Sequence, residues 1–342
     1  MDELTVIVTA SGAPGTARLL RALRENGERP VRLVGTDMSE RAVGAHLCDA
    51  FHRVPAGSDP AFPAAIRELA EREGAAAVLP QSSFDLEGLA ASPELFEGLP
   101  VLVSSASTIR RCNDKAETYA LLHDLGLPAP AFRRVGSAAA LETAAHELGY
   151  PQRPVCFKPV FSSGSRGFRV LDPELDRVHQ LLHERPGSVA MRLEEAVELL
   201  AGAEQLDLLV MELAQGAERT IDGIANGSEI VLGHAKTREA LRAGLAMYFV
   251  TLDDRALMEL AGRIVAEFGI EHFFNIQLVG GSVIEINPRI STIVYQDDLN
   301  LPYLGLKRAL GEISDSELAA LGSRIRPGRT ALRYFDQLEF DA

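Results

Sequence analysis

Short apolar runs alternate with amphipathic segments through the first third of the chain, and this alternation constrains the fold more than any other feature. Residues 15–26 and 61–73 place apolar side chains at the three- and four-residue spacing of a helix. Four further runs have the length and apolar content of strands: residues 4–10, 31–36, 75–79 and 100–103. Strands that alternate with helices predict a parallel sheet covered on both faces, so we expect an α/β domain over residues 1–110.

The first of these strands ends in the turn TASGAPGT, residues 9–16, which looks like the opening of a dinucleotide-binding fold. The turn holds only Gly12 and Gly15, so the full GxGxxG pattern is missing, and we interpret Asp37 as a cap on the second strand. Backbone N–H groups at a helix N-terminus still suit a carboxylate, so we predict that Ser11 and Gly12 contact a substrate. An NAD(P)-dependent oxidoreductase stays open as an alternative.

The rest of the chain carries a different pattern, in which helices, a Gly/Ser loop and hairpins follow one another. The pair Asn226-Gly227 is a strong hairpin signal, and the runs 206–213 and 218–225 also look hairpin-like. The segment 183–205 gives no clear prediction, and no internal repeat or low-complexity linker is visible. We expect helices over 114–125, 137–148, 253–269 and 302–310, and strands over 154–160, 206–213, 218–225, 226–235, 273–279 and 282–287.

The stretch NIQLVGGSVIEINPR, residues 275–289, is the most informative one for chemistry. Gln277 and Glu285 lie on opposite strands of the predicted hairpin, and Asn287 shares a face with Glu285 because side chains alternate along a strand. Three oxygen-bearing side chains that converge in this way predict a site for a hard cation, Mg²⁺ or Mn²⁺. Arg289 follows directly, and a guanidinium beside a metal carboxylate suits a phosphate or a developing acyl-phosphate. The alternative is the polar, solvent-facing side of an edge hairpin.

A strand lysine stands just before the Gly/Ser loop in CFKPVFSSGSRGF, residues 156–168. Gly164 and Gly167 allow backbone N–H groups to approach phosphates, and Lys158 adds a point charge. The loop is not a Walker loop, because its lysine precedes the glycines. The alternative is a flexible hairpin tip.

Two glutamates follow the next apolar strand, in LVMELAQGAERTID, residues 209–222. Backbone next to the strand end at Glu212 can pair with an adenine edge, and the carboxylate of Glu218 can accept hydrogen bonds from ribose hydroxyls. The alternative is a pair of surface glutamates.

Taken in order, these motifs resemble the ATP-grasp superfamily. A lysine opens a helix in NDKAETYALL, a strand lysine with its Gly/Ser loop follows, and a hinge glutamate has a GxE partner. The series ends in Gln…Glu-x-Asn-Pro-Arg. The likeness extends over residues 1–310 and is greatest to the synthetase halves of the carbamoyl-phosphate synthase large subunit and their single-unit relatives.

The resemblance implies an α/β architecture in three parts. Residues 1–110 would form a Rossmann-like pre-ATP-grasp domain, which in this family seldom binds a nicotinamide. Residues 111–310 would form a two-lobed α+β ATP-grasp fold with its lid lobe at about 127–209, and residues 311–342 would form a C-terminal tail that packs on it.

The resemblance also implies a role for each motif residue. Those implied to bind ATP are Lys115 and Lys158 on the phosphates, Ser163, Gly164, Ser165 and Gly167 in a flap over them, Glu212 with the backbone of Leu213 at the adenine, and Glu218 at the ribose. The implied Mg²⁺ or Mn²⁺ ligands are Gln277, Glu285 and Asn287. Arg289 is implied to contact the γ-phosphate and the acyl intermediate.

The chain departs from the carbamoyl-phosphate enzymes in ways that bear on its substrate. Those enzymes carry arginines where Lys115 and Lys158 stand, so the use of bicarbonate is an open question. Only one synthetase unit is present, and no glutaminase is visible.

A local basic cluster in HAKTREALRAG, residues 234–244, bears on the same question. It could bind the acceptor carboxylate or the transferred phosphate, or it could be a solvated loop. We assign Lys236 and Arg238 to catalysis together with Arg289. The further substrate contacts that we predict are Arg242 and, from the stretch PQSSFDLE, Ser83 and Asp85.

Composition excludes several classes of function. A formal net charge of −14 repels phosphodiester backbones, so we expect no nucleic-acid partner. Three cysteines without CxxC spacing fit a reducing compartment, and no apolar run approaches a membrane span. We therefore expect a cytoplasmic protein without a membrane partner, and a homodimer is the base expectation for its assembly.

The sequence predicts an ATP- and Mg²⁺-dependent carboxylate–amine, or carboxylate–ammonia, ligase that acts on small molecules through an acyl-phosphate. The full set of ATP and metal positions without a glutaminase motivates this prediction. Three alternatives remain. One is phosphorylation of bicarbonate or another small acid in the manner of carbamoyl-phosphate synthase, one is a nucleotide-binding partner subunit without turnover, and one is the NAD(P)-dependent oxidoreductase.

Overall fold

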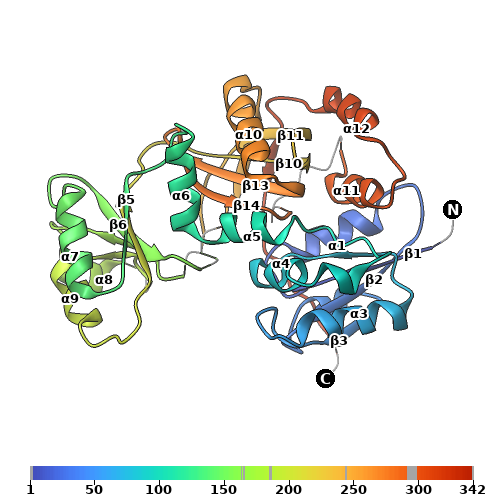
Figure 1. Cartoon of the computed structure of the whole chain (residues 1–342), viewed down its shortest axis with the longest axis horizontal. Helices are drawn as coiled ribbons and strands as arrows, with labels where there is room; N and C mark the ends of the chain where they lie inside the picture. Colours follow the sequence, from blue (N-terminus) through green and yellow to red (C-terminus); the bar gives the residue numbers. More distant parts are fainter. Residues whose placement is uncertain are drawn as a thin grey trace. The chain divides into compact units, whose positions relative to one another are not determined.

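A computed structural model describes residues 3–162, 164, 166–184, 187–242, 245–290 and 299–340 of the chain. By their internal contacts the residues group into two units (Figure 1). The first unit comprises Met1–Cys112, Glu218–Gln277 and Ile286–Ala342, and the second comprises Asn113–Ala217 and Leu278–Glu285.

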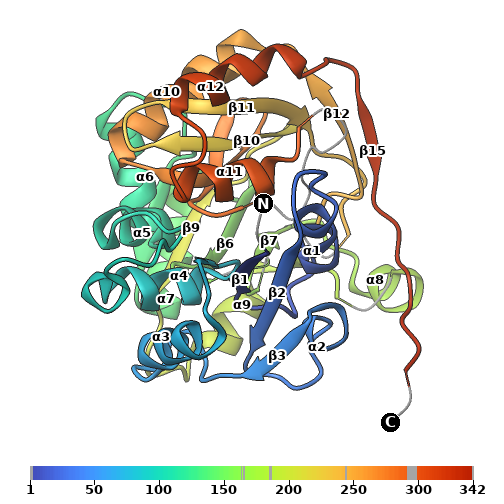
Figure 2. The ribbon, with the colours of Figure 1, turned by 90° about the vertical axis from the view of Figure 1, so that its right-hand side faces the viewer.

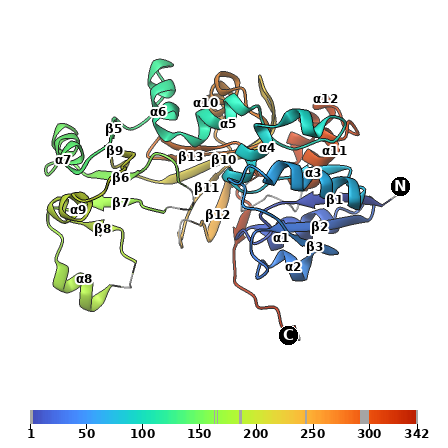
Figure 3. The ribbon, with the colours of Figure 1, turned by 60° about the horizontal axis from the view of Figure 1, so that its bottom comes forward.

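The first unit begins with a four-stranded parallel sheet, which confirms the α/β prediction for the start of the chain. The strand order is β3-β2-β1-β4, with β1 at Leu4–Val8, β2 at Val31–Asp37, β3 at Ala50–Arg53 and β4 at Ala77–Leu79. Val6, Val8 and Leu33 face a core shared with α1, and Ile7 and Val34 face a second core shared with α3. Both faces are therefore covered, as Figure 3 shows.

Two details of this sheet differ from the prediction. The run 100–103 makes only an isolated bridge between Val101 and Val78, because the Val103 N–H turns back to the Val101 carbonyl after two ladder bonds. Strand β3 was not predicted, because its residues AFHR are half-buried at the sheet edge and lack the β-branched side chains typical of strands. The helices of this part are α1 Thr16–Arg24, α2 Gly44–Leu47, α3 Phe62–Glu73, α4 Ser83–Ala90, η1 Pro93–Phe96 and α5 Ala106–Asn113.

A second sheet has the strand order β14-β13-β10-β11-β12-β15. Its strands are β10 Glu218–Asn226, β11 Ile230–Thr237, β12 Tyr248–Leu252, β13 Glu271–Val279, β14 Ser282–Asn287 and β15 Thr330–Leu332. The Asn226-Gly227 turn joins β10 to β11 as predicted, with Asp222 opposite His234 and Thr220 opposite Lys236. Because side chains alternate, these four residues share one face of the sheet.

Four helical segments belong to this part of the first unit: α10 Arg255–Phe268, α11 Leu301–Ala309, α12 Asp315–Leu321 and η2 Gly322–Arg324. Helices α10 and α12 pack against β11 (Figure 2), and α11 packs against α1 and β10. The α10 helix begins at the Asp254 cap, whose carboxylate accepts from the Leu257 N–H, and ends at Gly269 in a left-handed conformation.

The second unit is built on a five-stranded sheet with the order β5-β9-β6-β7-β8. Its strands are β5 Phe132–Val135, β6 Val155–Pro159, β7 Arg169–Leu171, β8 Ala190–Met191 and β9 Leu208–Glu212. Its helices are α6 Lys115–Asp124, α7 Ala138–Glu147, α8 Arg177–His183 and α9 Leu193–Leu200. Helices α7 and α9 lie side by side (Figure 1), and their apolar residues form one core with β6 and β9.

The hairpin-like pairing that we predicted for 206–213 and 218–225 is wrong. Strand β9 belongs to the sheet of the second unit, and β10 belongs to the second sheet of the first unit. The intervening AQGA segment therefore passes from one sheet to another.

No helix of the described ranges is long and apolar enough to cross a membrane.

Candidate functional site

Two of the three predicted metal ligands meet a third amide side chain in the first unit. Gln277 on β13 and Asn287 at the end of β14 both donate to Oδ1 of Asn275, at 2.9 and 3.4 Å. Asn275 is buried on β13, two residues before Gln277, so the two side chains share a face. The oxygens of such amides are ligands that fit a hard cation, and the third predicted ligand, Glu285, stands two residues before Asn287 on β14.

A buried ion pair lies behind Asn275. The Asp222 carboxylate accepts a hydrogen bond from Asn275 Nδ2 at 2.9 Å and pairs with Lys236 Nζ at 2.6 Å. The Asp222 and Lys236 side chains are only 1% and 3% exposed. On the same face, burial and, to a smaller extent, the neighbouring Lys236 charge lower the pKa of His234 to about 4. The structure therefore places Lys236, a predicted catalytic residue, in an ion pair inside the sheet.

Arg289 is held directly beside the amide group. Its Nη2 lies 3.4 Å from Asn287 Oδ1, and its Nη1 donates to the Ile290 carbonyl at 3.1 Å. Residues 291–298, which follow it, lie outside the described ranges.

Two other predicted basic residues of the first unit are also engaged. Arg238 Nη1 pairs with Glu218 Oε2 at 2.5 Å, so the predicted ribose carboxylate and a predicted catalytic cation hold each other in place. The Arg242 guanidinium stands over the Phe335 ring at 4.6 Å from its centroid.

The second unit holds the two predicted phosphate lysines. Lys115 opens α6 and donates to the Ser162 carbonyl at 2.7 Å, and burial lowers its pKa. Lys158 on β6 donates to Tyr119 Oη at 3.2 Å and to the Ile284 carbonyl at 3.4 Å. Burial lowers the pKa of Lys158 to about 8, although the Glu285 carboxylate raises it. Two ammonium groups and one carboxylate of the predicted site thus interact within this unit.

The predicted loop and hinge lie in the same unit. Gly164 and Gly167 both have positive φ, as a tight loop requires, whereas Ser163 and Ser165 lie outside the described residues. Glu212 ends β9, and its carboxylate interacts with the Ala131 N–H at 3.4 Å and with Arg153 at 3.6 Å. The Leu213 N–H donates to the Pro154 carbonyl at 3.0 Å, so adenine would replace that bond if it used this group.

One of the predicted substrate contacts in the first unit is a buried carboxylate. Asp85 lies in the first turn of α4, is 6% exposed and accepts from Thr9 Oγ1 at 2.6 Å. Burial raises its pKa to about 6, despite the opposing Thr9 hydrogen bond. The Gly12 N–H donates to Asp37 at 2.8 Å, in agreement with the capping role that we assigned to this aspartate.

Two more of these predicted contacts differ in their surroundings. Ser11 is fully buried, and among the described atoms its hydroxyl has no hydrogen-bond partner. Ser83 opens helix α4 and is half-buried.

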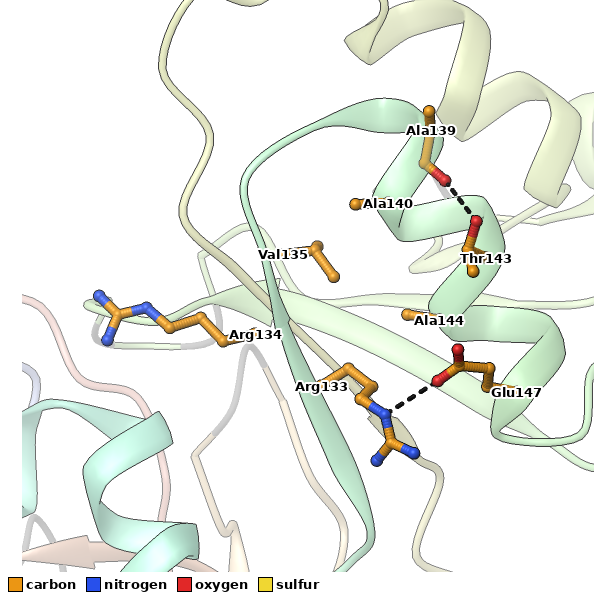
Figure 4. Close-up of a pocket in the computed structure, with 8 residues that line it drawn as sticks. All are labelled: Arg133, Arg134, Val135, Ala139, Ala140, Thr143, Ala144 and Glu147. Carbon is orange, nitrogen blue, oxygen red and sulfur yellow. Dashed lines mark hydrogen bonds and ion pairs between the residues drawn. The ribbon is translucent and has the colours of Figure 1, made fainter.

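An open pocket of the second unit lies apart from all of these residues. Figure 4 shows it between β5 and α7, where Arg133 pairs with Glu147 at 3.0 Å and small side chains of α7 form the wall. None of the predicted site residues lines it.

Three polar residues of these clusters were missed by the sequence reasoning: Asp222, Asn275 and Tyr119. Asn275 carried a usable signal, because its two-residue spacing from Gln277 places both side chains on one face. Asp222 and Tyr119 contact the site through partners far away in the sequence, so no local pattern marks them.

Known sequences match this chain over most of its length. A family model described as "ATP-grasp in the biosynthetic pathway with Ter operon" matches residues 204–329. The carbamoyl phosphate synthase large chain of Methanothermobacter thermautotrophicus is 25% identical over 293 residues, which cover 79% of this chain and 25% of that protein. The N-terminal section of that enzyme from Methanopyrus kandleri is 26% identical over 288 residues, with coverages of 79% and 48%. The chain thus spans less than half the length of these relatives.

Solved structures match the backbone. An L-amino acid ligase from Bacillus licheniformis superposes with a TM-score of 0.64 at 16% identity, and the match covers 96% of this chain and 78% of that one. A biotin carboxylase from Campylobacter jejuni in complex with β,γ-ATP gives a TM-score of 0.63 at 18% identity, with coverages of 95% and 74%.

Proposed function

We propose that this chain, which has the two-lobed ATP-grasp fold and resembles one synthetase unit of carbamoyl phosphate synthase, is an ATP- and Mg²⁺-dependent carboxylate ligase. In this proposal it joins a small carboxylate to an amine or to ammonia. The observation that carries the proposal is the group of amide side chains around Asn275 in the first unit, with Arg289 beside Asn287. Support comes from the second unit, where the Glu285 carboxylate interacts with the ammonium groups of Lys115 and Lys158.

The chemistry requires activation of the carboxylate, because its oxygen is a poor leaving group at neutral pH. Attack of a carboxylate oxygen on the γ-phosphorus of ATP releases ADP and forms an acyl-phosphate. The amine nitrogen then attacks the carbonyl carbon, phosphate leaves with the bonding electrons, and the nitrogen gives up a proton. The tasks of the protein are positioning and charge neutralisation.

We assign the nucleotide contacts to the second unit and to β10. Lys115 and Lys158 hold the phosphates, and the loop at Gly164 and Gly167 excludes water from the acyl-phosphate. Adenine contacts the backbone at Glu212 and Leu213, and Glu218 binds the ribose while Arg238 fixes its carboxylate. Ser163 and Ser165 belong to the same loop in this proposal.

The phosphate-transfer contacts come from the end of β14 and from its neighbour β13. Gln277, Glu285 and Asn287 would hold Mg²⁺ or Mn²⁺, which, when bound, neutralises the charge on the phosphate oxygens. Arg289 contacts the migrating phosphoryl group through the guanidinium that lies beside Asn287. Lys236 acts through its ion pair with Asp222, which accepts a hydrogen bond from Asn275.

The acid and the amine would contact the first unit. We propose Ser11, Gly12, Ser83, Asp85 and Arg242 as residues near these substrates, with the Asp85 carboxyl as the group that recognises an amine. A homodimer and a cytoplasmic location stay predictions from the sequence.

Release of ADP and phosphate tests the proposal. The protein is mixed with ATP, Mg²⁺ and a panel of small carboxylates, each with and without amino acids, other amines or ammonium. Release that needs both a carboxylate and an amine is the expected result. NADH binding is measured by nicotinamide fluorescence, which the tryptophan-free chain leaves without background. Tight NADH binding without any ATP turnover would overturn the proposal.

The carbamoyl phosphate synthase relatives favour one further candidate reaction, the phosphorylation of bicarbonate. In that case phosphate release depends on bicarbonate and not on an organic carboxylate. Nucleotide binding without any phosphate release would instead indicate a partner subunit without turnover.

A further inference from the structure

Asn275 occupies a position from which it controls two predicted metal ligands at once. Its Oδ1 accepts hydrogen bonds from Gln277 Nε2 at 2.9 Å and from Asn287 Nδ2 at 3.4 Å. Its Nδ2 donates to Asp222 Oδ1 at 2.9 Å and to the Thr220 hydroxyl. Asn275 is 5% exposed, so these protein contacts take the place of water.

The direction of this chain of hydrogen bonds is set at its buried end. An ionised carboxylate can only accept hydrogen bonds, whereas an amide side chain can present either its oxygen or its NH₂ group. Asp222 is buried, and while its Oδ1 accepts from Asn275, its Oδ2 pairs with Lys236 Nζ at 2.6 Å, so both carboxylate oxygens act as acceptors. Asp222 therefore requires the NH₂ side of Asn275, and the Asn275 oxygen must point toward Gln277 and Asn287.

The orientation then passes to the next two amides. Because Asn275 presents an oxygen, Gln277 and Asn287 must turn their NH₂ groups toward it, and their own oxygens point the other way. In agreement, Asn287 Oδ1 faces the Arg289 guanidinium at 3.4 Å. Amide oxygens are the atoms that coordinate Mg²⁺ or Mn²⁺, whereas an NH₂ group in the same place repels a cation.

We propose that Lys236, Asp222 and Asn275 form an orienting relay, which holds the Gln277 and Asn287 oxygens toward the metal position. These three are positioning residues, since they act through the two amides. The metal part of the inference rests on the proposed function. The amide orientation does not, because it follows from hydrogen bonds within the first unit.

A reciprocal exchange of residues tests the relay. In Asp222→Asn, the side-chain oxygen of residue 222 accepts from Lys236, and its NH₂ group turns toward Asn275. The Asn275 amide then flips and presents its NH₂ group to Gln277 and Asn287. These two residues must turn their oxygens toward Asn275 and away from the metal position. In Asp222→Asn/Asn275→Asp, position 275 is again an acceptor, so Gln277 and Asn287 return to their original orientation. Asn275→Ala breaks the relay without any change of charge. Asp253→Asn, at an exposed aspartate of the first unit, is the matched charge control.

Mn²⁺ binding in the presence of a non-hydrolysable ATP analogue is measured by electron paramagnetic resonance. We expect Asp222→Asn and Asn275→Ala to weaken Mn²⁺ binding about tenfold or more, as loss of outer-shell partners does at metal sites. The double variant recovers most of that loss, and Asp253→Asn binds as the wild type does. Equal Mn²⁺ affinity in Asp222→Asn and the wild type, or a double variant no better than Asp222→Asn, overturns the relay.

A second readout needs no metal. With ¹⁵N-labelled asparagine and glutamine, the side-chain NH₂ hydrogens of Gln277 should exchange slowly in the wild type and faster in Asn275→Ala. Equal exchange in both proteins contradicts the relay even if Asp222→Asn fails to fold. Slow exchange in a wild type that binds no Mn²⁺ would overturn the proposed function while leaving the orientation intact.

Discussion

Asp85 offers a direct test of the electrostatics of the first sheet, through the variant Asp85→Asn. Burial raises the pKa of this carboxyl from 3.8 to about 6 in the folded protein. A carboxyl with a raised folded-state pKa favours folding most when it is protonated. The contribution of Asp85 to stability is therefore fully present below about pH 3.8, falls as the pH rises, and is lost above about pH 6.

The magnitude follows from the pKa difference. Each pKa unit corresponds to about 1.4 kcal/mol, so keeping Asp85 ionised at pH 8 costs about 3 kcal/mol of folding free energy. Asparagine has the same shape, carries no charge and can still accept from Thr9. Its NH₂ group takes the place of the carboxylate oxygen next to Gly57, and the loss of that acceptor costs about 1 kcal/mol, which leaves a net stabilisation of about 2 kcal/mol at pH 8.

Urea denaturation of the wild type and Asp85→Asn at several values between pH 5 and pH 8 checks this prediction. The advantage of the variant should grow with pH and level off above about pH 7, while Glu94→Gln, at an exposed glutamate, shows no such trend. A variant that is less stable than the wild type at every pH would refute the reasoning. If Asp85 also binds an amine, the stabilised variant should bind that amine more weakly, since active groups are often kept at a cost in stability.

Three further predictions concern the other charged groups. Because burial lowers the pKa of Lys158 to about 8, affinity for a fluorescent ATP analogue should fall as the pH rises through about 8. The variant Lys158→Arg should remove that pH dependence, whereas the control Lys307→Met should keep it. Glu218→Gln should raise the KM for ATP about tenfold with little change in kcat, as measured by ADP release at varied ATP. Lys236→Met should lower the free energy of unfolding by about 3 kcal/mol or more in urea, because Asp222 stays buried without its ion-pair partner.

The parallel sheet at the start of the chain could be predicted because buried strands show continuous apolar runs. Strands β1 and β4 lie within the predicted runs 4–10 and 75–79, and β2 extends the run 31–36 by one residue, Asp37. The half-buried edge strand β3 has no continuous apolar run. The segment 100–103 does have one, but it leaves the sheet after a single bridge to Val78. Apolar content reports burial, and it does not report how many backbone hydrogen bonds a segment makes.

The candidate site could be predicted as an ordered series of motifs, since Lys158, Glu212 and the hairpin around Glu285 each carry a local pattern. The electrostatic state of its cations could not. Lys236 was predicted as a catalytic cation, and its ion pair with Asp222 depends on the register of β10 against β11. That register is a property of the folded sheet, and Asp222 on its own strand has no feature that marks it.

The most direct test of the central claim is carboxylate-dependent ADP release with ATP and Mg²⁺, compared among the wild type, Glu285→Ala and Asn287→Ala. The account predicts turnover by the wild type and a loss of about a hundredfold or more in each variant, since each removes one oxygen ligand of the metal. Thermal unfolding confirms that the variants are folded. Undiminished ADP release by folded Glu285→Ala and Asn287→Ala would contradict the account.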